Sequence, residues 1–136
     1  MFKKNAKIAR LKQVPLFSEC SQRELAEIAA IADEMHFPEG RTLIKEGAVG
    51  REFIVVLDGS VEVRRNGRRL PARGDASFFG ETALLTGARR TATVTAASAV
   101  RALLITDRAF RRLLEDSPGI QRKIMASLAA RVVDAD

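Results

Sequence analysis

Between residues 40 and 87, short apolar stretches alternate with single glycines. These recurring glycines limit the folds that the chain can adopt. A short apolar stretch that ends at a turn residue is typical of a β-strand, because a helix needs a longer run with helical periodicity. Many short strands with turn signals between them predict a sandwich or a barrel-like β fold. The strand candidates are residues 42–44, 53–57, 60–64, 91–95 and 99–105.

The strongest hairpin signal in this region is Asn66-Gly67, because both residue types tolerate the positive φ that a two-residue turn requires. Arg64-Arg65 and Arg68-Arg69 flank the turn, so four positive charges meet at one loop tip. The chain has no Trp or Tyr on which the bases of a single strand could stack. We therefore interpret this tip as a solvated surface.

Helical periodicity precedes the β region. A Lys/Arg-rich stretch with apolar residues at helical spacing predicts an amphipathic helix over residues 3–14, ended by Pro15. Ser21 and Glu24 have the spacing of a capping box, in which each residue satisfies a free backbone N–H of the first turn. The second helix is therefore predicted to begin at Ser21.

The pattern becomes helical again after the last strand candidate. Asp107 can cap a helix that ends around Ser117-Pro118, because the residue before a proline is disfavoured in a helix. A final helix is predicted beyond the proline, with Ile120, Ile124 and Leu128 on one face.

The composition excludes several kinds of site. Cys20 is the only cysteine and His36 the only histidine among 136 residues, which excludes an intrachain disulfide, a thiolate metal cluster and a multi-histidine metal site. No set of residues has the pattern of a catalytic base and nucleophile, and no apolar run is long enough to cross a bilayer. We expect a cytoplasmic, non-enzymatic protein without a metal site and without membrane insertion. Its net charge of +6 attracts anions without identifying one.

Residues 78–94 do not follow a simple pattern of core and turn. Residues 81–85 suit a single helical turn, whose free N–H groups and positive dipole end favour an anion. Arg90 lies between residues that look buried, and a buried charge needs a partner. A phosphate suits its guanidinium, because two parallel N–H donors meet two oxygens. Glu81 could instead pair with Arg90, and the residues alone leave both interpretations open.

This segment resembles the phosphate-binding cassette of the cyclic nucleotide-binding domain family, whose pattern runs Phe-Gly-Glu-x-Ala-Leu, then several residues, then Arg-x-Ala-Thr-Val. The matching residues are Phe79-Gly80-Glu81, Ala83-Leu84 and Arg90-Thr91-Ala92-Thr93-Val94. Upstream glycines also match, in Pro38-Glu39-Gly40, Lys45-Glu46-Gly47 and Leu57-Asp58-Gly59-Ser60-Val61. The resemblance thus extends over about the whole chain.

The resemblance implies a mainly β fold with flanking helices. The expected β-roll is a double-stranded β-helix (jelly-roll) of eight strands, with an N-terminal helical pair and C-terminal lid helices. Residues 1–136 would then be a single domain, in which residues 1–36 form the N-terminal helices. Residues 37–106 would form the β-roll with the cassette at 79–94, and residues 107–136 the C-terminal helices.

The resemblance also assigns roles to single residues. Arg90 would bind the cyclic phosphate, and Glu81 would accept a hydrogen bond from the ribose 2′-hydroxyl. Val63, with Val55 as a further candidate, would line the base. The remaining expected site residues shape the ribose side or surround the phosphate: Phe79, Gly80, Thr82, Ala83, Thr91 and Ala92.

Two residues bear on the ligand and the signal. In some relatives a Thr at the position of Thr91 bonds the guanine amino group, but others with the same Thr bind cAMP. We expect cAMP as the ligand in preference to cGMP, and no other cofactor. Arg131 falls where bacterial channel-type relatives carry an Arg that covers the purine; the alternative is a solvated arginine near a fraying terminus. In the first case, ligand binding would shift the population of lid-helix positions.

The sequence departs from the family pattern at two places. Arg89 stands where relatives often have Pro, and Asp75-Ala76 replaces a frequent Pro-Gly pair. Arg89 either adds positive potential beside the phosphate or is a surface charge.

The expected output is a partner effector protein or a fused output domain, with the chain as a monomer or homodimer. One alternative is the nucleotide-binding half of a catabolite-activator-type transcription regulator. No recognition helix follows the lid within residues 1–136, so we expect no direct DNA binding by this chain. A second alternative is a scaffold β-roll without ligand.

Overall fold

The computed structural model describes residues 4–74, 77–80, 84 and 86–135, with the backbone alone for residues 128 and 130–135. The chain divides into two compact units. One combines Met1–Ile31 with Arg108–Asp136 and is helical; the other is Ala32–Asp107 and contains the strands.

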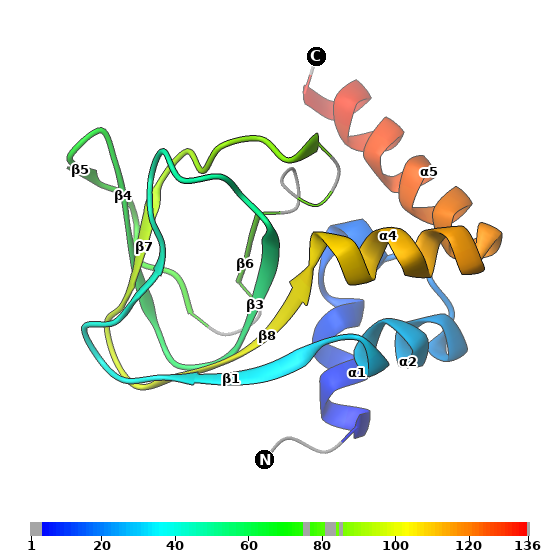
Figure 1. Ribbon diagram of the computed structural model, residues 1–136, viewed down its shortest axis with the longest axis horizontal. Coiled ribbons are helices and arrows are strands. Elements are labelled where there is room, and N and C mark those ends of the chain that lie inside the picture. Colours follow the sequence, from blue (N-terminus) through cyan, green and yellow to red (C-terminus); the bar gives the residue numbers. More distant parts are fainter. Residues whose placement is uncertain (1–3, 75–76, 81–83, 85, 136) are drawn as a thin grey trace. The chain divides into compact units, whose positions relative to one another are not determined.

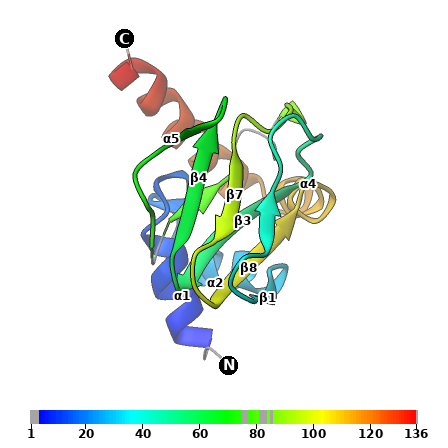
Figure 2. The same ribbon diagram turned by 90° about the vertical axis from the view of Figure 1, so that its left-hand side faces the viewer.

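Eight strands form two antiparallel four-stranded sheets within the described part of the β unit (Figure 1). The first sheet has the order β1-β8-β3-β6 and the second β2-β7-β4-β5. Figure 2 shows β4 and β7 running side by side in the second sheet. The bounds are β1 Asp33–Phe37, β2 Thr42–Ile44, β3 Glu52–Asp58, β4 Val61–Arg65, β5 Arg68–Arg69, β6 Phe78–Phe79, β7 Thr93–Ala96 and β8 Val100–Thr106. The predicted mainly β fold with flanking helices is confirmed.

Both sheets contribute side chains to one apolar core. Successive side chains of a strand point to opposite faces of the sheet, so only every second one reaches the core. In β4, Val61 and Val63 are buried, whereas Glu62 between them is only half-buried. The buried members of this core are Ile44, Ile54, Val56, Val61, Val63, Val94, Ala96, Val100 and Ala102. Phe79 and Ala92 pack against it while partly exposed, so the cassette segment lies at the margin of the core.

The predicted hairpin at Asn66-Gly67 is confirmed. Asn66 has φ 53° and Gly67 has φ 78°, the two positive values that a tight two-residue turn between twisted strands requires. The second strand of the hairpin, β5, covers only Arg68–Arg69. Leu70 still donates its N–H to the carbonyl oxygen of Val63 at 2.8 Å.

The sequence pattern does not predict β1. Its exposure pattern shows no buried residue, because β1 is at the edge of its sheet. Among the described strands it pairs with β8 alone, from Asp33 opposite Leu104 to Phe37 opposite Val100. Backbone pairing rather than apolar alternation therefore fixes this strand. The predicted strand 91–95 is shifted toward the C-terminus, since β7 spans Thr93–Ala96.

The helices are α1 Lys4–Lys12, the 3₁₀ helix η1 Pro15–Phe17, α2 Gln22–Ala30, α4 Asp107–Asp116 and α5 Pro118–Ala135. The prediction that Pro15 ends the first helix is wrong, because α1 ends earlier and Pro15 begins η1. Proline suits a first helical turn, where its missing N–H would have no intrahelical partner. No helix in the described ranges has both the length and the apolar character needed to span a membrane.

The predicted capping box of α2 is confirmed. Ser21 Oγ accepts from the Glu24 N–H at 3.2 Å, and the Glu24 carboxylate accepts from the Ser21 N–H at 2.8 Å.

Two contacts join the helices of this unit. The Glu24 carboxylate oxygen that accepts from Ser21 also accepts from Lys123 Nζ of α5 at 2.5 Å. Phe17 of η1 and Phe110 of α4 are fully buried, with ring centroids 6.4 Å apart. The first contact ties α5 to α2, and the second ties α4 to η1.

Candidate functional site

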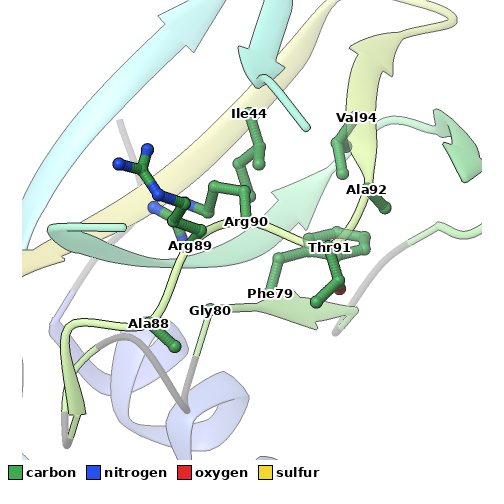
Figure 3. A pocket seen from close by; sticks show the side chains of 9 residues that line it. All are labelled: Ile44, Phe79, Gly80, Ala88, Arg89, Arg90, Thr91, Ala92 and Val94. Atoms are coloured by element: carbon green, nitrogen blue, oxygen red, sulfur yellow. The ribbon is translucent and has the colours of Figure 1, made fainter. Parts of the chain in front are cut away.

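A pocket of about 170 Å³ opens in the β unit beside the cassette segment. Figure 3 shows Arg89 and Arg90 at one end of it and the apolar side chains of Phe79, Ala92 and Val94 at the other. The complete lining is Ile44, Phe79, Gly80, Ala88, Arg89, Arg90, Thr91, Ala92 and Val94. The pocket therefore offers positive charge to one end of a ligand and an apolar surface to the other.

The backbone of residues 88–90 is held by the loop between β2 and β3. Arg90 donates its N–H to the Ala48 carbonyl oxygen at 2.8 Å, and the Arg90 carbonyl oxygen accepts from the Gly47 N–H at 2.9 Å. Arg89 forms an antiparallel bridge with Val49 and donates Nη1 to the Gly47 carbonyl oxygen at 2.9 Å. These bonds fix the backbone from which the Arg90 side chain extends.

The Arg90 side chain is only 8% exposed and is anchored by Glu52 of β3. Nη2 donates to the Glu52 carbonyl oxygen at 2.6 Å and lies 3.4 Å from the carboxylate oxygen Oε2. Burial lowers the pKa of Arg90, and the Glu52 charge partly offsets that shift. An arginine stays protonated under such a shift, so a permanent cation lines the pocket.

The second terminal nitrogen of Arg90 has no protein partner among the described residues. This nitrogen, Nη1, is buried and makes no hydrogen bond to any described residue. It occupies the space beside Gly80 that a β-carbon would need, and Gly80 has φ +89°, a conformation that favours glycine. A buried donor without an acceptor carries a desolvation cost of roughly 1–3 kcal/mol. The arrangement therefore suits an acceptor supplied from outside the chain.

The structure brings some of the predicted site residues together; Val55, which is fully buried in β3, is not one of them. Five line the pocket, namely Phe79, Gly80, Arg90, Thr91 and Ala92. Val63 lies in the core opposite Val94 in the β4–β7 register, but it is not among the lining residues. Glu81, Thr82 and Ala83 lie outside the described residues, and Arg131 is in α5 without a described side chain.

The one-turn helix expected at residues 81–85 falls mostly outside the described residues. Within it, Leu84 is helical and buried, and its N–H donates to the Gly80 carbonyl oxygen at 3.3 Å. The two residues are four positions apart, which is the spacing of an α-helical hydrogen bond.

Sequence reasoning missed Glu52 as the partner of Arg90. The two residues lie 38 positions apart, and no local pattern links them. It also missed Ile44, Ala88 and Val94 as lining residues. Ile44 and Val94 face each other across the β2–β7 pair, so a strand register would have been needed to find them.

Arg73 is a further residue that the sequence did not single out. Its guanidinium lies over the Phe79 ring, 4.8 Å from the centroid, which adds a further cation beside the pocket, against a ring that lines it. Across the described ranges, no group of three or more His, Cys, Asp and Glu side chains could hold a metal ion.

Comparison with known sequences identifies the kind of domain. The family model described as "Cyclic nucleotide-binding domain" matches residues 34–117. A cAMP-dependent protein kinase regulatory subunit of Mycosarcoma maydis is 38% identical over 121 residues, which covers 81% of this chain and 23% of that protein. Its counterpart in Aspergillus fumigatus is 37% identical over 119 residues, covering 85% of this chain and 28% of that protein. The chain thus spans about a quarter of the length of these relatives.

Solved structures agree with this result. The N-terminal domain of a transcriptional regulator from Streptomyces coelicolor A3(2) superposes with a TM-score of 0.87 at 29% identity, covering 93% of this chain and 94% of that one. The catabolite activator protein of Thermus thermophilus has a TM-score of 0.74 at 26% identity, covering 90% and 60%. Since the family model matches more than half of the residues, this chain belongs to the cyclic nucleotide-binding domain family.

Proposed function

We propose that this chain is a non-catalytic sensor that binds a cyclic nucleotide in the pocket beside β7, with Arg90 on the cyclic phosphate. The observation that carries the proposal is the buried Nη1 of Arg90, which has no hydrogen-bond partner among the described residues. A phosphate diester supplies an anionic oxygen of the kind that a guanidinium binds most strongly. Because Nη2 is already anchored on Glu52, the guanidinium is preorganised for this contact.

The two ends of the pocket support a ligand of this shape. A cyclic nucleotide carries its negative charge at one end and a flat, largely apolar base at the other. Arg89 and Arg90 would meet the phosphate, and Phe79, Ala92 and Val94 would contact the sugar and base side (Figure 3). Pockets for small ligands commonly combine an apolar lining with a few fixed polar groups.

The family pattern supplies the remaining contacts of the proposal. Glu81 accepts from the ribose 2′-hydroxyl, and backbone N–H groups around Ala83 and Thr91 donate to the phosphate. The family pattern assigns Thr82 to the same part of the binding site. Val63 does not line the pocket, so its part on the base side would be to support Val94, its partner in the same core. Gly80 keeps the backbone free of a side chain where the phosphate-binding arginine lies.

We favour cAMP over cGMP as the ligand. The curated relatives that support this choice are by name cAMP-dependent. Thr91 lines the pocket and is exposed, so its hydroxyl is available to a base, but it does not by itself select guanine. Equal affinity for the two nucleotides would remove this part of the proposal and leave the sensor function intact.

The proposed output is a movement of α5, with Arg131 covering the purine when the ligand is bound. A partner effector protein or a fused output domain would read that movement in the cytoplasm. The similar Streptomyces coelicolor structure is the N-terminal domain of a transcriptional regulator, which favours a regulator of transcription as a second candidate context. The named relatives are regulatory subunits of a kinase, which favours a kinase partner.

Calorimetric titration with cAMP, cGMP and 5′-AMP tests the proposed function. We expect cAMP to bind the wild-type chain and to raise its melting temperature. Arg90→Ala should weaken binding by about 10- to 100-fold, because it removes charge-assisted hydrogen bonds. Arg111→Ala is the matched control, since Arg111 is an exposed arginine of α4. Failure of both cyclic nucleotides to bind wild type would refute the sensor function.

A further inference from the structure

The tip of the β4–β5 hairpin carries Arg64, Arg65, Arg68 and Arg69 around Asn66-Gly67, and we refer to it as the arginine hairpin. All four arginines are exposed. The register places Arg64 directly opposite Arg69 and Arg65 directly opposite Arg68. Like charges directly opposite each other destabilise an antiparallel pair, so the bare hairpin carries an electrostatic cost.

One face of the arginine hairpin already holds a carboxylate. Glu62 of β4 lies 2.5 Å from Arg64 Nε and 3.6 Å from Arg69 Nη2, so one carboxylate bridges that opposed pair. The hydrogen bond from Arg64 lowers the pKa of Glu62, as expected for a carboxylate held in its charged form. On this face the repulsion between the two guanidinium groups is offset within the chain.

The other face has no such carboxylate among the described residues. Because side chains alternate along a strand, Arg65 and Arg68 project on the opposite side of the ribbon from Glu62. Neither residue forms an ion pair or side-chain hydrogen bond with any residue in the described ranges. Each face of the hairpin thus carries one pair of opposed arginines. Among the described residues, a carboxylate neutralises the pair Arg64 and Arg69 but not the pair Arg65 and Arg68.

The arginine hairpin is held at a fixed position. Glu46 Oε1 accepts from the Asn66 N–H at 3.0 Å, and the Glu46 N–H donates to Thr93 Oγ1 of β7 at 3.0 Å. β5 is at the edge of its sheet, so no further strand of the described chain covers it. The backbone of this turn therefore does not have to become ordered when a partner binds, and only the arginine side chains lose conformational freedom.

We propose that Arg65 and Arg68 dock an Asp/Glu-bearing segment of a partner protein, whose carboxylate takes the place that Glu62 occupies on the other face. Arginine suits this role, because its planar fork binds a carboxylate through two parallel hydrogen bonds. A single-stranded nucleic acid fits less well, because the chain has no Trp or Tyr on which its bases could stack. This surface is separate from the pocket, whose lining contains no residue of the arginine hairpin.

A fluorescein-labelled oligoglutamate peptide is the probe, with binding followed by anisotropy at low salt. The test variant is Arg65→Gln with Arg68→Gln. The control is Arg111→Gln with Arg112→Gln, which removes the same charge from exposed positions of α4. We expect the hairpin variant to lose about tenfold in peptide affinity and the control less than about twofold. Thermal unfolding of the hairpin variant should be unchanged or slightly shifted to higher temperature, because opposed charges are removed.

Three results would overturn the proposal. The first is no binding of the peptide by wild type, and the second is an equal loss of affinity in both variants, which would mean attraction by net charge alone. The third is tighter binding of a DNA duplex or of phosphatidylglycerol vesicles than of the peptide. Titration of the same variants with cAMP keeps this result separate from the proposed sensor function, which Arg90 carries.

Discussion

Nη1 of Arg90 occupies the space that a β-carbon at Gly80 would need. The same β-carbon would lie 2.7 Å from the Glu52 carbonyl oxygen, which is the anchor of Nη2. One glycine therefore leaves room both for the guanidinium and for the backbone that holds it. The family's Phe-Gly-Glu pattern has a direct steric reason in this chain.

Gly80→Ala should lower both stability and cyclic nucleotide affinity. The methyl group would displace the guanidinium, and φ +89° is strained for any residue with a β-carbon. We expect a loss of about 1–3 kcal/mol in the free energy of unfolding, measured by urea denaturation. Nucleotide binding, measured by calorimetry, should weaken together with it.

Gly40→Ala separates the two effects. Gly40 has nearly the same backbone angle, φ +88°, but a β-carbon there would meet no atom within 4 Å in the described ranges, apart from its chain neighbours. This variant should show the backbone strain without the loss of nucleotide affinity. An equal loss of affinity in both alanine variants would contradict the steric role of Gly80.

Glu52→Gln should raise cyclic nucleotide affinity. The carboxylate is 40% exposed and 3.4 Å from Nη2, so it contributes little to anchoring, whereas its charge repels an incoming phosphate. The main-chain bond at 2.6 Å remains in the variant. We expect a gain of about 0.5–1 kcal/mol by calorimetry. Glu62→Gln is the control, and weaker binding by Glu52→Gln would show that the carboxylate positions Arg90.

Glu46→Ala should destabilise the β4–β5 turn. The variant removes the acceptor of the Asn66 N–H, at an expected cost of about 0.5–1.5 kcal/mol in the free energy of unfolding. Hydrogen exchange of the Asn66 amide measures the local effect. Glu46→Gln keeps an oxygen acceptor and should lie between wild type and the alanine variant. Identical exchange in all three proteins would exclude the bond as a determinant of the turn.

Acid should destabilise the protein partly through Glu24. Its pKa is lowered, first by the hydrogen bond from Lys123 and then by the Ser21 N–H. A carboxylate whose pKa is lower in the folded state stabilises the fold above its ordinary pKa of 4.5 and loses that contribution as the pH falls through the folded value. Melting temperatures should therefore fall more steeply with acidification in wild type than in Glu24→Gln. Parallel curves would rule out this contribution.

Local patterns were sufficient for the features that depend on neighbouring residues. The capping box at Ser21 and Glu24 and the turn at Asn66-Gly67 appear as predicted, because each is stabilised within a few residues by backbone geometry. The cassette resemblance led to Arg90 and Gly80, and the family is confirmed. By contrast, the sequence pattern did not predict β1, because this strand is stabilised by pairing with β8, which is far away in the sequence.

By itself the sequence determined the class of fold, the family and Arg90 as the candidate for binding a phosphate. Only the tertiary structure decided that Glu52 anchors Arg90, that Ile44 and Val94 line the same pocket, and that Arg65 and Arg68 lack, among the described residues, the carboxylate that serves Arg64 and Arg69. The physical reason is that Glu52 and Arg90, like Ile44 and Val94, are far apart in the sequence. Register sets which distant backbones lie about 5 Å apart, and no local propensity encodes it.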